Sequence, residues 1–122
     1  MIITYTGSAG ELETTDIADI EIHRNVAANG TNPVAATAIP ATCARTVAIV
    51  TTSTGNVSVF LAGGQVGAVI EVYAVSGPVT VYAGTTISVG DPLVPFLNGA
   101  TTVIVTSGAR FKSVSGKWAH LS

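Results

Sequence analysis

Residues 46–82 read TVAIVTTSTGNVSVFLAGGQVGAVIEVYAVSGPVTVY, and this stretch decides the predicted fold. Its many β-branched Val, Ile and Thr side chains fit a pleated sheet better than a helix. Apolar residues occupy both faces of 46–52, as in a buried central strand, and they alternate with other side chains in 57–62 and 68–75. Turn residues separate these runs at 53–56, 63–67 and 76–78. The stretch therefore predicts successive strands joined by short turns.

Further along the chain, Asn98-Gly99 lies between two apolar runs, residues 93–97 and 100–106. This is the strongest hairpin signal in the sequence, because both turn residues tolerate the positive φ of a type I′ turn. Pro95 lacks an N–H group, so its strand is expected at a sheet edge or at a bulge.

A last hairpin is expected to turn at Ser115-Gly116. Thr, Val and Ala each occur 17 times in the 122 residues, and no convincing helical period or clean internal repeat is present. The fold predicted for residues 45–122 is therefore all-β. We expect a small single-domain barrel or sandwich, connected as a β-meander.

Residues 1–44 read differently and predict an extended N-terminal arm. Ile20 and Ile22 alternate with Asp19 and Glu21, which indicates a half-exposed strand, whereas 25–42 reads as an arm or a long loop. The arm holds few apolar residues, so we expect it to dock on a partner rather than to pack in the core. Its candidate interface residues are Ile2, Ile3, Glu11, Glu13, Asp16, Ile17, Asp19, Ile20, Glu21 and Ile22.

The charges are few and are separated along the chain. Only 10% of the residues are charged, against about 25% in an average globular protein. Either Thr, Ser and Asn cover the surface, or much of the surface meets other chains. Five of the seven acidic residues lie in 11–21, and Arg110, Lys112 and Lys117 lie near the C-terminus. Two explanations of this separation remain open. The charged segments are ordinary solvated ends, or the acidic segment contacts the basic end of another subunit or another basic surface.

Several function classes are disfavoured by composition. A net charge of −2 argues against a general nucleic-acid binder. The single cysteine, Cys43, allows neither an intrachain disulfide nor a cysteine-rich zinc site. We recognise no signal peptide and no apolar run long enough to span a membrane, so we expect synthesis in a reducing cytoplasm.

No motif for chemistry is complete. The glycine-rich loop 63–67 leads into a strand and lacks the lysine of a phosphate-binding loop. His23 shares a strand face with Asp19 and Glu21 simply because the side-chain period is two, and a solvated face explains this better than a metal site. Cys43 is interpreted as a packing residue. We therefore predict no catalytic site, no metal, no cofactor and no small-molecule substrate.

Residues 83–99 read AGTTISVGDPLVPFLNG. This run resembles a phrase in the small cement proteins that decorate bacteriophage heads, although residues 107–112, SGARFK, depart from the phrase that usually follows there. The resemblance implies a non-enzymatic homotrimer on the outer capsid surface of the virion. It also implies that the major capsid protein is the partner, contacted by the N-terminal arm.

Two other readings remain open from the sequence. One is a phage tail-tube, head-fibre or baseplate component, which would share the β-rich composition. The other is a small ligand-binding β-barrel, which belongs to a different functional class.

Overall fold

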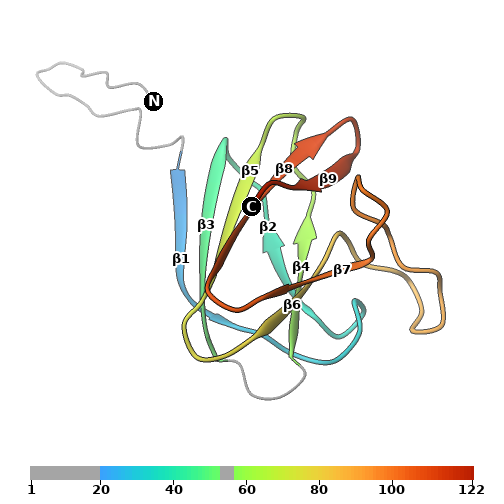
Figure 1. Cartoon of the computed structure of the whole chain (residues 1–122), viewed down its shortest axis with the longest axis horizontal. Helices are drawn as coiled ribbons and strands as arrows, with labels where there is room; N and C mark the ends of the chain where they lie inside the picture. The colour runs from blue at the N-terminus through green and yellow to red at the C-terminus, as the bar shows by residue number, and fades with distance from the viewer. Residues whose placement is uncertain (1–19, 53–56) are drawn as a thin grey trace, which may run out of the picture.

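The computed structural model describes residues 20–52 and 57–122, and this part of the chain contains strands and loops but no helix. The predicted all-β class is confirmed. A five-stranded sheet has the order β1-β3-β5-β8-β9, and a four-stranded sheet has the order β2-β4-β6-β7 (Figure 1). The strands are β1 (Ile20–Ala27), β2 (Thr37–Pro40), β3 (Arg45–Thr52), β4 (Ser58–Ala62), β5 (Val69–Ala74), β6 (Val79–Tyr82), β7 (Thr102–Val105), β8 (Gly108–Val114) and β9 (Lys117–His120).

The first six strands wind as a solenoid of three coils, and each coil gives one strand to each sheet. Within each sheet these strands pair in parallel. Ile20 aligns with Arg45 and Arg45 with Val69, which lie 25 and 24 residues further along the chain. The coils therefore repeat in space although the sequence shows no clean repeat. A coil of this kind needs only inward apolar side chains at corresponding positions.

The predicted β-meander is wrong for these six strands, because consecutive strands lie in opposite sheets. Turn residues mark where the chain changes direction, but they do not say whether it returns to its own sheet or crosses to the facing one. Consecutive strands pair directly in two places, β6 with β7 and β8 with β9. Because β7 and β8 run antiparallel to β6 and β5, the last three strands close one end of the solenoid.

Neither sheet closes on itself. β1 and β9 form the edges of one sheet, and β2 and β7 form the edges of the other. The barrel alternative is therefore wrong, and the two facing sheets correspond to the sandwich alternative.

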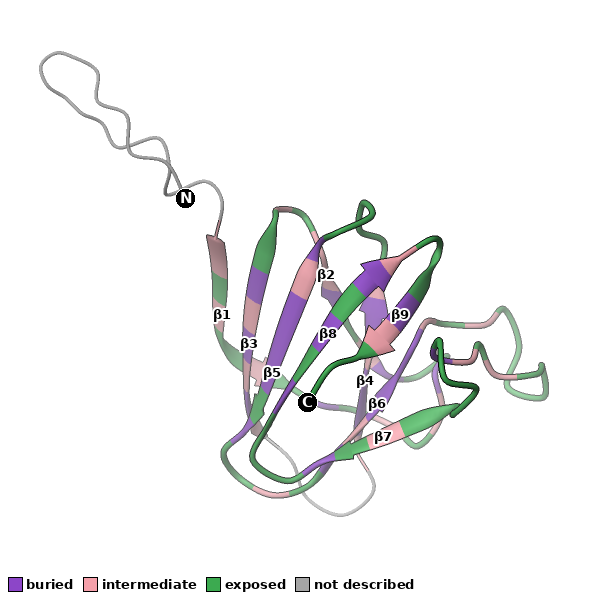
Figure 2. Cartoon of the chain, turned by 45° about the horizontal axis from the view of Figure 1, so that its top comes forward, coloured by how far each residue is buried: buried purple, intermediate pink, exposed green. Residues whose placement is uncertain are grey.

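One apolar core lies between the two sheets, where the buried residues of both meet (Figure 2). Val50 of β3 and Val72 of β5 point inwards, and Val47 and Ile49 on the other face of β3 are only partly buried. This alternation follows the two-residue period of a strand. Each fully buried Val, Leu or Ile side chain stabilises the fold by about 1.5–3 kcal/mol.

The boundary predicted at residue 44 does not separate an arm from the domain. β1 pairs with β3, β2 pairs with β4, and Ile39 of β2 is 1% exposed within the core. The prediction that 25–42 forms an arm or loop outside the core is therefore wrong. Residues 37–40 do not look like a core strand in the sequence, because they carry one large apolar side chain and end in a proline. Residues 1–19 lie outside the described residues.

The hairpin predicted around Asn98-Gly99 is also wrong as a strand pair. Residues 93–97 form a loop, and β7 pairs with β6 instead. A tight turn does form here, but it is not the expected type I′ turn, because Gly99 has a positive φ of +92° and Asn98 does not. The N–H of Gly99 donates to the carbonyl of Phe96. Phe96 is fully buried and stacks on Phe111 with 5.6 Å between ring centroids. The apolar run therefore supplies a core side chain, and Pro95 lies in a loop.

The last predicted hairpin is confirmed, with β8 and β9 joined at Ser115-Gly116. Both turn residues have positive φ, +49° at Ser115 and +83° at Gly116, as a type I′ turn requires.

Candidate protein interface

β1 turns its apolar side chains away from the core. Ile22 aligns with Val47 of β3, on the outer side of the sheet, whereas Glu21 aligns with Thr46, which is fully buried between the sheets. Because alternate residues of a strand face opposite sides, Ile20 lies on the same outer side as Ile22. Two of the predicted anchor residues therefore face outwards, and Ile22 is 46% exposed.

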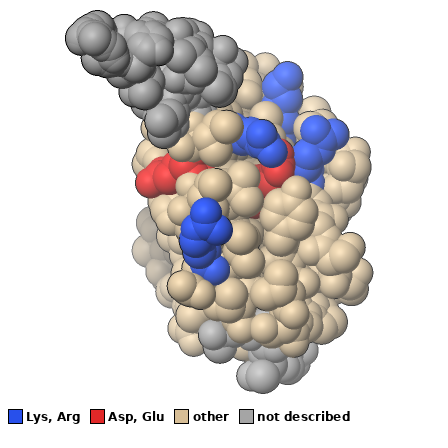
Figure 3. All heavy atoms as spheres, turned by 90° about the vertical axis from the view of Figure 1, so that its left-hand side faces the viewer, with Lys and Arg blue, Asp and Glu red and all other residues tan. Residues whose placement is uncertain are grey.

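The outer face of the five-stranded sheet combines apolar and charged side chains. We use this term for the residues that the register places on that side of β1, β3, β5 and β8: Ile20, Ile22, Arg45, Val47, Ile49, Val69, Glu71, Tyr73, Arg110 and Lys112. In Figure 3 most of the visible Lys and Arg side chains gather near one carboxylate in the upper half of the molecule.

Glu71 is the centre of the charged part. The Nε and Nη2 groups of Arg45 donate hydrogen bonds to its two carboxylate oxygens, at 2.8 and 3.1 Å, and the hydroxyl of Tyr73 donates a third at 2.9 Å. The Glu71 side chain is only 7% exposed. A buried carboxylate is tolerated when its lone pairs are satisfied, and a bidentate arginine is the strongest partner for one.

Gly108 of β8 makes room for this arrangement. It pairs with Tyr73 of β5, and a Cβ atom at Gly108 would lie 2.9 Å from the Tyr73 ring. The ring therefore lies over the glycine, in a position from which its hydroxyl reaches Glu71. A larger residue at this position would displace the ring.

These contacts shift the pKa values of the three groups. The hydrogen bond from Arg45 lowers the pKa of Glu71, with further help from Tyr73 and the charge of Arg110, although burial opposes the shift. The hydrogen bonds that Arg45 and Tyr73 donate to Glu71 also raise the pKa of Arg45 and the pKa of Tyr73. The carboxylate is therefore ionised and fully engaged at neutral pH, which makes it a structural group rather than a proton-transfer group.

Glu21 faces the core side of β1. It is the acidic residue of the predicted interface that lies among the described residues. It accepts a hydrogen bond from the hydroxyl of Thr42, and its Oε1 atom lies 3.7 Å from Nε2 of His23. The side chains of both Glu21 and His23 are partly exposed, but the Nε2 atom of His23 is buried and has no hydrogen-bond partner among the described residues. The other predicted interface residues, Ile2, Ile3, Glu11, Glu13, Asp16, Ile17 and Asp19, lie outside the described residues.

A long loop between β6 and β7 projects from the sandwich (Figure 1). It contains the run 83–99 that carries the resemblance. Ile87 near its tip is 93% exposed, and Val89 is also exposed. Exposed apolar side chains that gather in one patch are typical of interaction sites, and Ile87 and Val89 lie two residues apart in this loop. This exposed loop was not predicted from the sequence. The signal for it is an apolar residue between Thr86 and Ser88 in a turn-rich run.

Hydrogen bonds hold the loop in shape. The hydroxyl of Thr85 donates to the carbonyl of Pro33 at 2.9 Å, which ties the base of the loop to the segment before β2. The backbone N–H of Ser88 donates to the Asp91 carboxylate at 3.0 Å, and the N–H of Asp91 donates to the carbonyl of Ser88. Ile87 is thus presented on a turn whose polar groups are already satisfied.

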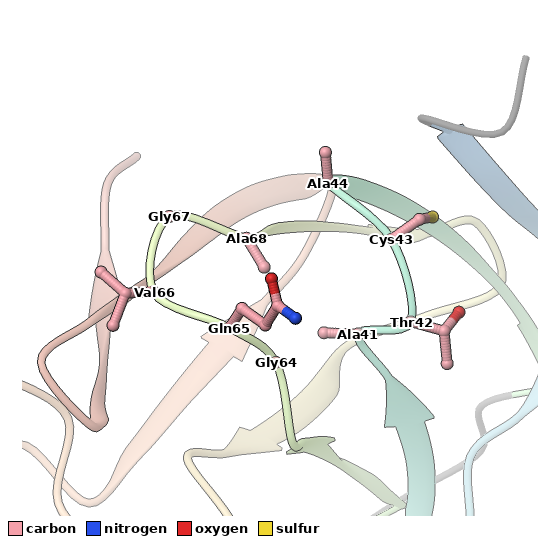
Figure 4. A pocket seen from close by; sticks show the side chains of 9 residues that line it. All are labelled: Ala41, Thr42, Cys43, Ala44, Gly64, Gln65, Val66, Gly67 and Ala68. Atoms are coloured by element: carbon pink, nitrogen blue, oxygen red, sulfur yellow. The ribbon is translucent and has the colours of Figure 1, made fainter. Parts of the chain in front are cut away.

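A groove with a volume of about 570 Å³ lies between the loop 41–44 and the loop 64–68. Figure 4 shows the Gln65 amide reaching into it, while the side chains of Thr42 and Cys43 point away. Cys43 is half-buried, and its Sγ atom donates to the carbonyl of Arg45 at 3.3 Å. No His, Asp, Glu, Lys or Arg among the described residues lines the groove.

The part of the chain that the structure describes brings no three His, Cys, Asp or Glu side chains together as a possible metal site. Over the same residues, no helix has the length and apolarity of a membrane span. Comparison with protein-family models, curated proteins and solved structures finds no match for this chain.

Proposed function

We propose that this chain is a non-enzymatic structural protein that decorates the outer surface of a bacteriophage head as a homotrimer. The observation that carries the proposal is the projecting loop. The run that resembles the cement proteins is the segment that leaves the sandwich and exposes Ile87 and Val89. A rigid turn with an exposed apolar tip suits insertion into a pocket of a partner, because little ordering is needed on binding.

The outer face supports the same proposal. Ile22 and Tyr73 are exposed on it, and the charge of Glu71 is already neutralised by Arg45. Interface centres are poor in unpaired charge and rich in aromatic and aliphatic side chains. The loop and the outer face lie on different sides of the molecule, as a subunit needs if it binds both a shell and its own copies.

The first test is the mass of the purified full chain in solution. Light scattering coupled to gel filtration is expected to give three times the monomer mass of 12.2 kDa. A monomer at every concentration, with or without heads present, contradicts the trimer.

The second test measures binding to phage heads that lack decoration protein. Ile87→Asp is expected to weaken binding at least about tenfold, which corresponds to about 1.4 kcal/mol. Ile104→Asp is the matched control, because Ile104 is 58% exposed on the edge strand β7 and is not part of the loop. Equal losses for both variants contradict the role of the loop. Binding of the unaltered chain to tails or baseplates but not to heads supports the tail-component alternative and contradicts the proposal.

A further inference from the structure

The folded part of the chain and the residues that precede it carry opposite charge. Residues 1–19 contain Glu11, Glu13, Asp16 and Asp19 and no Lys or Arg, whereas residues 20–122 contain five cations and three carboxylates. One of these three carboxylates, Glu71, is already engaged by Arg45. Arg110 also acts on Glu71 through its charge.

Four of the five cations gather at one end of the five-stranded sheet. Ile20, Arg45, Val69 and Lys112 align across β1, β3, β5 and β8, and Arg110 lies two residues before Lys112. Lys117 pairs with Val114 at the same end of β8. Among the described residues, Arg110, Lys112 and Lys117 form no ion pair. We call Arg45, Arg110, Lys112 and Lys117 the basic end of the sheet.

The acidic segment enters the sheet at this same end. Asp19 directly precedes Ile20, and Ile20 is the register partner of Arg45. Lys112 is three strands away from β1, a distance of about 14 Å at ordinary strand spacing. The nine residues 11–19 can span up to about 30 Å when extended. The segment can therefore reach every cation of the basic end without leaving its own molecule.

We propose that residues 11–19 bind in cis across the basic end of the sheet on which their own chain begins. The carboxylates of Glu11, Glu13 and Asp16 pair with the cations Arg110, Lys112 and Lys117. Leu12 and Ile17 cover Ile22 and Val69 on the outer face. The tether favours this occupant over a second copy, because a short link gives an effective concentration in the millimolar range. The basic end of one chain also repels that of another, which disfavours direct pairing of two outer faces.

The consequence for interactions is specific. The basic end and part of the outer face are covered in the free protein, and any acidic partner must first displace the segment. The inference goes beyond the proposed function and holds whatever surface the chain binds.

The test is carbodiimide cross-linking of the full chain, which joins lysines to carboxylates in direct contact. Equal amounts of ¹⁴N- and ¹⁵N-labelled protein are denatured together, refolded, cross-linked and analysed by mass spectrometry of the peptides. We expect Lys112 and Lys117 to be linked to Glu11, Glu13 or Asp16, with both halves of each linked peptide carrying the same isotope. Linked peptides of mixed isotope assign the segment to a second copy, and no link at all shows that the basic end is free. Either result overturns the proposal.

Two variants show whether charge holds the segment. Arg110→Gln removes a cation that does not itself cross-link, and it is expected to lower the yield at Lys112 by about threefold, as for one exposed ion pair. Arg24→Gln is the matched control, because Arg24 is exposed on β1, four residues beyond Ile20. Sodium chloride at about 1 M, where the screening length is about 3 Å, is expected to abolish the links. Links that persist in salt, or an equal loss in both variants, contradict the electrostatic contact.

Discussion

Ile39 is the side chain through which β2 enters the core, so Ile39→Ala tests whether the first coil belongs to the folded domain. The side chain is 1% exposed and belongs to the same apolar cluster as Leu61, its register partner on β4. The substitution removes three buried carbon groups, which are worth about 2.4 kcal/mol by transfer alone. The cavity left behind brings the expected loss to about 2–5 kcal/mol.

This loss is a large part of the total stability of about 5–15 kcal/mol expected for a domain of this size. Thermal unfolding followed by circular dichroism should show it as a fall in Tm of about 3–6 °C for each kcal/mol. Ile22→Ala is the matched control, since it removes the same atoms from a side chain that is 46% exposed on β1. Its expected cost is below about 1 kcal/mol. If the two variants lose the same stability, β2 is not packed in the core and the three-coil fold is refuted.

Three other predictions follow from single features. Glu71→Gln should destabilise the protein at pH 7, because the lowered pKa of Glu71 confers stability only while the carboxylate is ionised. The difference in urea midpoint between the variant and the unaltered chain should therefore shrink as the pH falls below 4.5. A difference that does not depend on pH contradicts this. Gly116→Ala should cost about 1–2 kcal/mol in urea unfolding, because Gly116 has a φ of +83°, whereas Gly90→Ala, at a position with open space and no positive φ, should cost less. A chain that begins at Ile20 should keep a cooperative thermal transition, and one that begins at Cys43 should lose it because β1 and β2 are gone; survival of the shorter chain restores the arm reading of residues 20–42.

The sequence predicted local features of the fold where side-chain alternation and turn chemistry suffice. The inward positions Val50 and Val72 follow from the two-residue period of their strands, and the turn at Ser115-Gly116 follows from its composition. Alternation and turn chemistry could not predict which sheet each successive strand joins. Parallel pairing of β1 with β3 depends on where the chain goes after each turn, and the turn residues do not encode that choice.

β2 and the run 93–97 were misread for a related reason. β2 has little intrinsic strand character, and it is a strand because its edge fits alongside β4. Residues 93–97 look like a strand, but they form a loop in which the Phe96 ring is buried and stacks on Phe111. In both cases tertiary contacts override local preference.

The sequence predicted that Ile20 and Ile22 anchor the chain on a partner, and this stays a prediction. The register of β1 places both side chains on the outer face. The contact of Arg45 with Glu71 joins residues 26 positions apart, so only the register of β3 and β5 brings them together. The sequence gives one indication of this contact, because a single glutamate in an otherwise apolar strand needs a hydrogen-bonding or charged side chain beside it.

The most direct measurement of the central claim is a cryo-electron microscopy reconstruction of undecorated phage heads, with and without the purified chain. The proposal predicts added density on the outer surface with threefold symmetry, into which three copies of the sandwich fit. It also predicts that the loop with Ile87 lies against the shell. Heads that gain no ordered density at saturating protein, while the chain itself stays folded, would contradict the claim that this protein decorates a capsid.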